Sequence, residues 1–255
     1  MIQQNSEQSI KNALSRMTPI DLAGLDRVAL MNRVDTKYVL NDAELPGVLD
    51  RISPDYGVLE VEGLRCSPYA TLYFDTPNDD CYRDHHNGKG QRFKYRMRSY
   101  LASDTSFFEV KRRTNKGRTV KSRVVVPAIR SALDDRVREF ADSTTGEPIC
   151  LESAVWTQFS RITLAGWDVK ERVTIDVDLS FEQEGRSVAL PGVAIVEVKQ
   201  ERNSRESPIR QALRAIRVSP MRISKYCIGR AMLDPTLKSN RFKRKLLALR
   251  NITCM

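Results

Sequence analysis

Hydrophobic and polar residues alternate along most of the chain between residues 33 and 200. In RFKYRMRSY (92–100) a cation stands at every second position, and Phe93, Tyr95 and Met97 stand between the cations. Successive side chains of a β-strand point to opposite faces, so the cations share one face and the apolar residues share the other. In a helix the same residues would scatter around the axis. The pattern therefore predicts a strand with one charged face.

Other segments with the same period also predict strands. They are bounded by turn sequences such as NGKG and TNKG, in which glycine and asparagine favour tight reversals. These segments are RVDTKYVL (33–40), VLEVEG (58–63), ATLYFDT (70–76), FFEVKRR (107–113), RTVKSRVVV (118–126), ERVTIDVDLSF (171–181) and VAIVEVKQ (193–200). Together with 92–100 they give about eight strands. VWTQFSRITL (155–164) is a candidate ninth strand.

Helical patterns lie mainly toward the two ends of the chain. Apolar residues at three-to-four spacing predict helices between residues 6 and 32, where Pro19 interrupts the pattern. Further helices are predicted over 131–141, 207–216 and 223–233. We expect three parts: an N-terminal helical segment (1–24), one main domain (25–235) and a basic C-terminal tail (236–255).

The charged faces of the predicted strands share an unusual composition. In ERVTIDVDLS one face holds Arg172, Thr174, Asp176 and Asp178, and at least four strands carry closely spaced Arg or Lys on one face. The polar face of a single strand usually faces water. Cations this dense repel one another across a sheet unless an anion or a metal neutralises them. The pattern favours an α+β fold: a closed antiparallel β-barrel with a charged lumen and helices covering its apolar outer faces.

Composition narrows the class of partner. The chain has 42 Lys and Arg against 32 Asp and Glu, a formal charge of +10, which favours phosphates, nucleic acid or an anionic membrane surface. No apolar run reaches membrane-spanning length and the N-terminus has no signal-peptide core, so we expect a cytoplasmic protein. The five cysteines show no CxxC spacing and are predicted to be reduced thiols.

An ordered set of motifs resembles a known family. RVDTKY, YFDTP, KYRMRSY, FEVKRR, RTVKSR, SRITL, RVTIDVDL, IVEVKQ and SKYCIG follow one another between about residues 25 and 233. This order is similar to the polyphosphate polymerase domain of the vacuolar transporter chaperone (VTC) proteins in its bacterial form, within the triphosphate tunnel metalloenzyme superfamily. The resemblance implies a tunnel whose basic residues bind ATP and inorganic polyphosphate and whose acidic residues hold Mn²⁺ or Mg²⁺.

The resemblance also implies roles for individual residues. Arg33 stands where that superfamily often has a glutamate, which leaves Asp35 as the acidic residue of the first strand. The expected catalytic contacts are Lys37, Arg96, Arg98, Lys111, Arg161, Arg172 and Lys225. The expected phosphate-binding residues are Arg123, Ser224, Lys94 and Lys199, and the expected metal ligands are Glu197 and Glu109. Ion pairing is a comparable alternative for Glu109, and for Asp176 and Asp178 it is favoured over metal binding.

Three functions remain open on this scaffold. The first is a polyphosphate polymerase that transfers the γ-phosphate of ATP, the second a tripolyphosphatase or nucleoside triphosphatase, and the third a polyphosphate or inositol-phosphate binding module without turnover. The basic amphipathic tail predicts either a helix packed on the barrel or a segment that docks on a membrane protein or on the anionic inner surface of the membrane. No specific nucleic-acid reader is recognised. His85 and His86 are predicted to lie in a surface loop.

Overall fold

The computed structural model describes residues 2–26, 28, 34–201 and 206–254, with side chains from residue 6 onward. The strands are β1 (Pro19–Ile20), β2 (Val34–Asn41), β3 (Tyr56–Leu59), β4 (Ser67–Asp75), β5 (Arg92–Tyr100), β6 (Thr105–Arg113), β7 (Thr119–Val126), β8 (Glu152–Gly166), β9 (Glu171–Gln183), β10 (Arg186–Leu190) and β11 (Val193–Gln200). The helices are α1 (Ile2–Ser15), α2 (Leu22–Asp26), η1 (Asp42–Glu44), α3 (Leu45–Ile52), α4 (Asp80–Asn87), α5 (Asp135–Thr145), α6 (Pro208–Ala215), α7 (Lys225–Leu233), η2 (Asn240–Phe242) and α8 (Lys243–Thr253).

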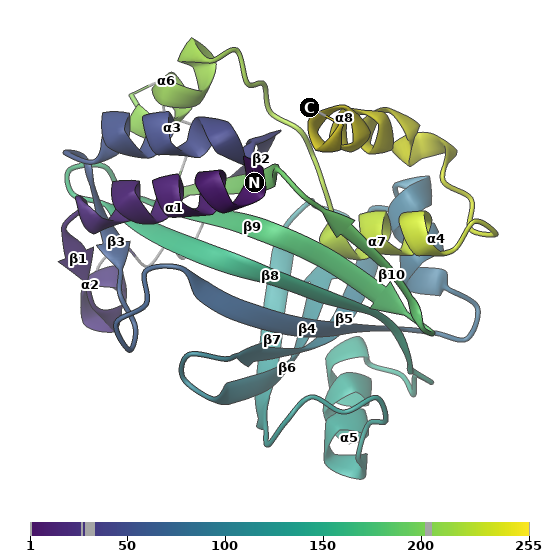
Figure 1. Ribbon diagram of the computed structural model, residues 1–255. Helices are drawn as coiled ribbons and strands as arrows, with labels where there is room; N and C mark the ends of the chain where they lie inside the picture. Colours follow the sequence, from purple (N-terminus) through teal and green to yellow (C-terminus); the bar gives the residue numbers. More distant parts are fainter. Residues whose placement is uncertain (1, 27, 29–33, 202–205, 255) are drawn as a thin grey trace.

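The strands form one large curved sheet with the order β2-β11-β9-β8-β4-β5-β6-β7 (Figure 1). All pairs along this path are antiparallel, and the short β1 pairs with β3 in parallel. The predicted α+β class is confirmed. The closed barrel is not: among the described residues, β2 and β7 stand at the two ends of the order without pairing to each other. Lys121 and Arg123, two residues apart on β7, discourage pairing at this edge.

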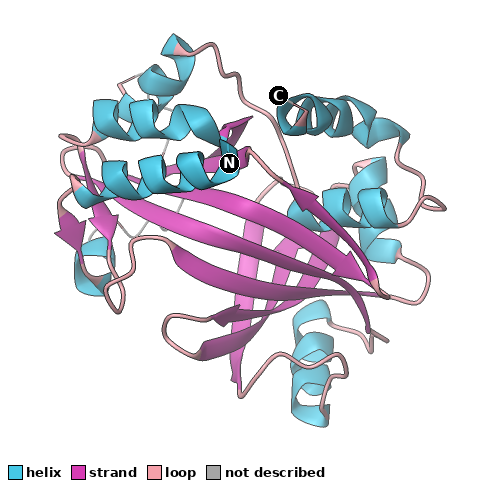
Figure 2. Cartoon of the chain, in the orientation of Figure 1, coloured by secondary structure: helices cyan, strands magenta, loops and turns pink. Residues whose placement is uncertain are grey.

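Two groups of helices cover the sheet (Figure 2). Helices α1, α3 and α6 bury the apolar outer face of β2, β8, β9 and β11, and α4, α5, α7 and α8 contribute to a second core. The first core contains Ile10, Leu14, Tyr38, Leu40, Val48, Leu49, Ile162, Leu164, Val173, Ile175, Val196, Val198, Ile209 and Leu213. In β9 between Val173 and Val177 the apolar residues of this core alternate with polar ones, so the hydrophobic effect fixes which side the polar residues face.

A β-bulge interrupts the long strand β9. Ser160 pairs with Val177 and Gln158 pairs with Ser180, so Asp178 and Leu179 together stand opposite the single residue Phe159. Asp178 has a positive φ of 54° and is exposed. The prediction that Asp178 shares a face with Arg172 is therefore wrong, because the extra residue breaks the alternation.

Several local predictions differ from the structure. His85 and His86 lie in the last turn of α4 instead of a surface loop, and His86 is buried at 4% exposure. Gly88, with φ of 77°, ends this helix in the left-handed conformation that glycine adopts without strain. Helix α3 and strand β10 had no predicted counterpart. In the predicted helical region up to residue 32, α2 ends at Asp26, and residues 27 and 29–33 lie outside the described residues.

The described helices include none with the length and apolar character needed to cross a bilayer.

Candidate functional site

Backbone pairing places the basic residues of the strands on one face of the sheet. Arg96 of β5 lies opposite Glu109 of β6, and Arg161 of β8 lies opposite Asp176 of β9. Directly paired residues share a face and side chains alternate along a strand, so each such pair fixes the face of its strand. The cations assigned in this way to the concave face are Lys37, Arg92, Lys94, Arg96, Arg98, Lys111, Arg113, Lys121, Arg123, Arg161, Arg172 and Lys199.

Helix α7 lies against the same face and turns its N-terminus toward these cations. Ser224 caps the helix by accepting a hydrogen bond from the amide of Cys227, and it accepts a 2.8 Å hydrogen bond from Nζ of Lys94. Farther along, a Cβ on Gly229 would come within 2.5 Å of Phe181, so glycine permits the helix to approach the sheet this closely. A helix N-terminus carries free amides and partial positive charge, which favour phosphate.

Glu109 is a fully buried carboxylate on the concave face. It is 0% exposed, forms ion pairs with Arg96 and Lys121, and accepts a 2.6 Å hydrogen bond from Nε of Arg96. Burial would raise the pKa of Glu109, but Arg96 and the neighbouring cations outweigh burial and hold the pKa below its ordinary value. Glu109 therefore stays ionised between two cations, which is the ion-pairing alternative of the sequence analysis.

Asp176 and Lys225 join β8, β9 and α7. Asp176 accepts hydrogen bonds of 2.6 and 2.8 Å from Arg161 and forms an ion pair with Lys225. The ammonium of Lys225 also lies 4.5 Å from the ring centroid of Phe159, within cation–π range. Burial lowers the pKa of Lys225 to about 8, and the attraction of Asp176 opposes this effect. The side chain of Lys225, at the N-terminus of α7, is thus largely shielded from water.

Glu197 stands at the β2–β11 side of the same face. Its carboxylate lies 3.1 Å from Nζ of Lys199 and 3.5 Å from Nζ of Lys37. Burial would raise the pKa of Glu197, but Lys37, Lys199 and Lys111 outweigh it and hold the pKa well below its ordinary value. The described residues contain no group of three or more His, Cys, Asp or Glu arranged to hold a metal ion. Glu197 therefore fits a divalent ion only where phosphate oxygens and water complete the coordination, which is the usual arrangement for Mg²⁺.

Other cations on this face lie close to like charges. Arg98 is 6% exposed, and its Nε donates a 3.1 Å hydrogen bond to the hydroxyl of Thr71. Burial lowers the pKa of Arg98, and repulsion from Arg96 and Arg161 lowers it further. Arg96 is likewise the main cause that holds the pKa of Lys111 well below its ordinary value, followed by burial. Repulsion between buried cations is relieved when an anion binds among them.

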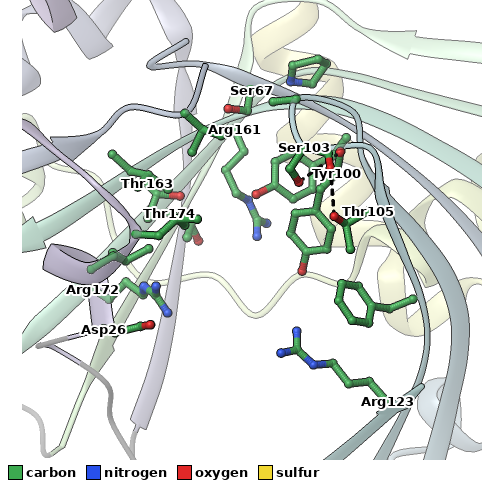
Figure 3. Close-up of a pocket in the computed structure, with 18 of the residues that line it drawn as sticks. Asp26, Ser67, Tyr100, Ser103, Thr105, Arg123, Arg161, Thr163, Arg172 and Thr174 are labelled. Carbon is green, nitrogen blue, oxygen red and sulfur yellow. Dashed lines mark hydrogen bonds between the residues drawn. The ribbon is translucent and has the colours of Figure 1, made fainter. Parts of the chain in front are cut away.

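One end of the concave face opens into a cavity of about 580 Å³. Figure 3 shows Arg161 and Arg172 entering it from one wall and Arg123 from the opposite wall. Tyr100 lines the cavity next to Phe107, whose ring the guanidinium of Arg123 covers, and Leu25 from α2 contributes to an apolar part. The cavity therefore combines guanidinium groups with apolar and aromatic surface.

The structure brings the sequence-predicted residues together. All of the predicted catalytic, phosphate-binding and metal-binding residues lie on the concave face or at the N-terminus of α7. Lys121 was missed, although its place two residues before Arg123 on a basic strand was the available signal. Tyr73 was also missed: its hydroxyl accepts a 3.4 Å hydrogen bond from Arg96. Burial would raise the pKa of Tyr73, but Arg96, Arg98 and Lys94 outweigh it and lower the pKa to about 8.

The curved antiparallel sheet and its basic concave face define a class of α+β protein whose concave face attracts anions. The family model described as the VTC domain matches residues 32–234. The chain therefore belongs to the VTC domain family, as its motif order predicted. No curated protein matches the chain.

Solved structures resemble the fold at low sequence identity. A candidate adenylyl cyclase from Hippeastrum, described as having a dominant triphosphatase activity, is 15% identical with a TM-score of 0.51, covering 79% of this chain and 96% of that chain. A candidate adenylate cyclase from Vibrio parahaemolyticus is 12% identical with a TM-score of 0.44, covering 77% of this chain and 96% of that chain. At 15% identity the Hippeastrum likeness shows a shared fold.

Proposed function

We propose that the protein is a metal-dependent polyphosphate polymerase that transfers the γ-phosphate of ATP to a growing inorganic polyphosphate chain. The observation that carries the proposal is the convergence of lysines and arginines, most of them buried or half-buried, from both halves of the sheet with the N-terminus of α7. Phosphoryl transfer needs little covalent help from a protein. It needs neutralised charge on the non-bridging oxygens and an in-line arrangement of attacking and leaving oxygens.

The residues of the concave face would contribute to phosphoryl transfer in different ways, according to their positions. Arg161, fixed by its two hydrogen bonds to Asp176, has a set orientation, and a guanidinium fork matches two phosphate oxygens at once. Arg98 and Lys111 lie near other cations that repel them. A bound polyphosphate chain would relieve this repulsion, so these two residues favour its binding. Lys225 and the free amides at the start of α7 add positive charge from above the sheet. A chain of phosphates bound here is therefore neutralised from several sides.

The cavity at the end of the face supports a nucleotide as the phosphate donor. A triphosphate alone would need only cations, but this cavity also offers Tyr100, Phe107 and the apolar residues Leu25 and Leu59. Its volume of about 580 Å³ falls in the range of small-molecule sites. We assign this part to the nucleoside, with the triphosphate directed toward Arg161.

The ion pairs favour polymerase over hydrolase. Attack by water is assisted by a general base, whereas the terminal oxygen of a phosphate chain is already ionised at neutral pH. The carboxylates of Glu109 and Asp176, which are buried, and of Glu197, which is half-buried, all lie beside lysine or arginine, which lowers their basicity. The alternative is a tripolyphosphatase or nucleoside triphosphatase, and the Hippeastrum protein with the shared fold is described by that activity. A non-catalytic binding module is the third candidate.

The proposed metal site rests on Glu197. A divalent ion held between Glu197 and the phosphates would neutralise charge on the non-bridging oxygens. Lys37 and Lys199, on either side of this carboxylate, keep it ionised and oriented. The metal role of Glu109 stays a prediction, because its observed neighbours are cations.

Product analysis separates the three functions. Purified protein is incubated with ATP and Mn²⁺ or Mg²⁺, and the products are resolved by chain length on a gel. A ladder of lengthening polyphosphate supports the polymerase, release of free phosphate without chains supports the hydrolase, and polyphosphate binding without nucleotide consumption supports the binding module. Lys225→Met should abolish turnover, and Arg136→Met, which removes an exposed cation from α5, should not.

The C-terminal helix α8 is not needed for this proposal. Leu249 and Phe242 are buried in the fold, and Leu247 is exposed. The helix thus packs on the domain, and a membrane-surface role for its basic residues stays a prediction. The partners that we propose are ATP and inorganic polyphosphate.

A further inference from the structure

A second cavity lies on the opposite side of β5 from the cations. Its volume is about 500 Å³, and it is bounded by the loop before α4, by α4 itself, by β5 and by the loop after α5. The residues that line it are Thr76, Pro77, Asn78, Asp80, Cys81, Asp84, Phe93, Tyr95, Glu147, Pro148, Ile149 and Cys150. Nothing in the proposed phosphoryl transfer uses this cavity.

The charge of this cavity is opposite to that of the concave face. Asp80, Asp84 and Glu147 line it, and its lining includes no lysine, arginine or histidine. Asp84 has a partner in Lys89, at 2.6 Å, while Glu147 is exposed at the rim. In a chain with a net charge of +10, a small acidic cavity is a local exception that attracts cations.

Tyr95 gives the cavity a buried polar group that the fold leaves unused. Its side chain is 0% exposed, and within the part of the chain that the structure describes its hydroxyl has no hydrogen-bond partner. Burial raises the pKa of Tyr95, and Cys81, Asp75 and Glu147 raise it further. A buried hydroxyl without a partner is costly, and a ligand that hydrogen-bonds to it removes that cost.

The aromatic rings add an apolar surface of defined shape. Phe93 and Tyr95 stack with ring centroids 5.9 Å apart and an interplanar angle of 14°. Such faces pack against methylene groups and attract ammonium groups. A ligand for this cavity would therefore combine an apolar body with positive charge.

We propose that this cavity binds a small organic cation, an alkyl chain carrying primary ammonium groups. The carboxylates of Asp80, Asp84 and Glu147 attract the ammonium groups, the hydroxyl of Tyr95 accepts a hydrogen bond from one of them, and the two rings cover the methylene chain. A divalent metal fits less well, because these carboxylates do not form a metal-holding group of three among the described residues. The volume suits a small molecule.

The proposal does not depend on the function of the concave face. Tyr95 lies between Lys94 and Arg96 in the sequence, but alternation points its side chain to the other side of the sheet. Binding can therefore be measured with the concave face left unaltered.

Titration calorimetry of the full chain with diaminobutane tests the proposal. Butanediol, of similar length and without charge, and MgCl2 at equal ionic strength are the comparison ligands. Tyr95→Phe removes the hydroxyl and Glu147→Gln removes one charge at the rim, and each should weaken diaminobutane binding roughly three- to tenfold. Glu139→Gln, at an exposed carboxylate on α5, is the matched control and should bind as the parent does.

The folding of the variants is checked by thermal unfolding without ligand. Tyr95→Phe should be at least as stable as the parent, because the hydroxyl it removes has no partner in the fold. Saturable binding of the diamine that the diol does not reproduce and that Tyr95→Phe weakens would support the proposal. Equal binding by Tyr95→Phe and the parent, stronger binding of Mg²⁺ than of the diamine, or no binding of the diamine would overturn it.

Discussion

Replacing Arg98 with methionine should stabilise the protein while it weakens anion binding. Arg98 is buried on the concave face, and within the described residues no carboxylate lies at ion-pair distance from it. Its neighbours include Arg96 and Arg161, which repel it. Methionine has an unbranched apolar side chain that fills a similar space without the charge.

The magnitude follows from the contacts of Arg98. Burying an unpaired cation costs several kcal/mol, roughly 5. Cation–π contacts with Tyr69 and Phe159, both at 5.7 Å from the ring centroid, stabilise the buried Arg98 by about 1 kcal/mol each. The hydrogen bond to Thr71 returns about 1.5 kcal/mol. Arg98 is therefore unfavourable by about 1.5 kcal/mol, which corresponds to a rise in Tm of about 3 to 6 °C for Arg98→Met.

Thermal unfolding with and without tripolyphosphate measures both effects. Without the anion, Arg98→Met should unfold at a higher temperature than the parent. With tripolyphosphate at a hundred times its Kd, the parent should gain about 2.7 kcal/mol and become the more stable protein, because the variant binds the anion weakly. A variant that unfolds below the parent without anion, or that gains as much from tripolyphosphate, would show that Arg98 is not a strained phosphate-binding cation.

Three further predictions concern single groups. Turnover should fall as the pH rises through about 8, where Lys225 loses its proton, and Lys225→Arg should remove this dependence. Glu197→Gln should abolish metal-dependent turnover and leave tripolyphosphate binding measurable by calorimetry; loss of both would contradict its assignment to the metal. Burial raises the pKa of Glu171 from 4.5 to about 7, so the folded protein binds more protons than the unfolded chain between these values and its stability falls as the pH rises. At 1.36 kcal/mol per pH unit the cost reaches about 3 kcal/mol above pH 7, and Glu171→Gln should raise the Tm at pH 8 but not at pH 4.

Alternation along the strands was sufficient to predict the basic face. RFKYRMRSY predicted a strand at 92–100, and β5 spans Arg92–Tyr100 with its cations on the concave side. The same argument placed Lys37, Lys111 and Glu197 on that side. This works because strand period is a local property, and one buried face fixes the orientation of the whole strand.

Features that depend on distant contacts were not predictable. The pairing order of the strands, and hence the open sheet, is decided by neighbours far apart in the chain. The bulge at Asp178 left no mark in the alternation of ERVTIDVDLS. The sequence predicts a loop at His85 and His86 because DCYRDHHN has a weak apolar pattern, yet this segment forms α4, and Tyr82 and His86 are buried against Phe242 from near the C-terminus.

The single residue inserted at Asp178 also affects the net charge of the concave face. In an uninterrupted strand the side chain at this position would point inward, two residues beyond Asp176 and close to Arg161. A second acidic group there would compete with an incoming phosphate for the same guanidinium. The bulge instead exposes the carboxylate of Asp178 to solvent. The concave face therefore keeps more positive charge than the number of acidic residues in β9 suggests.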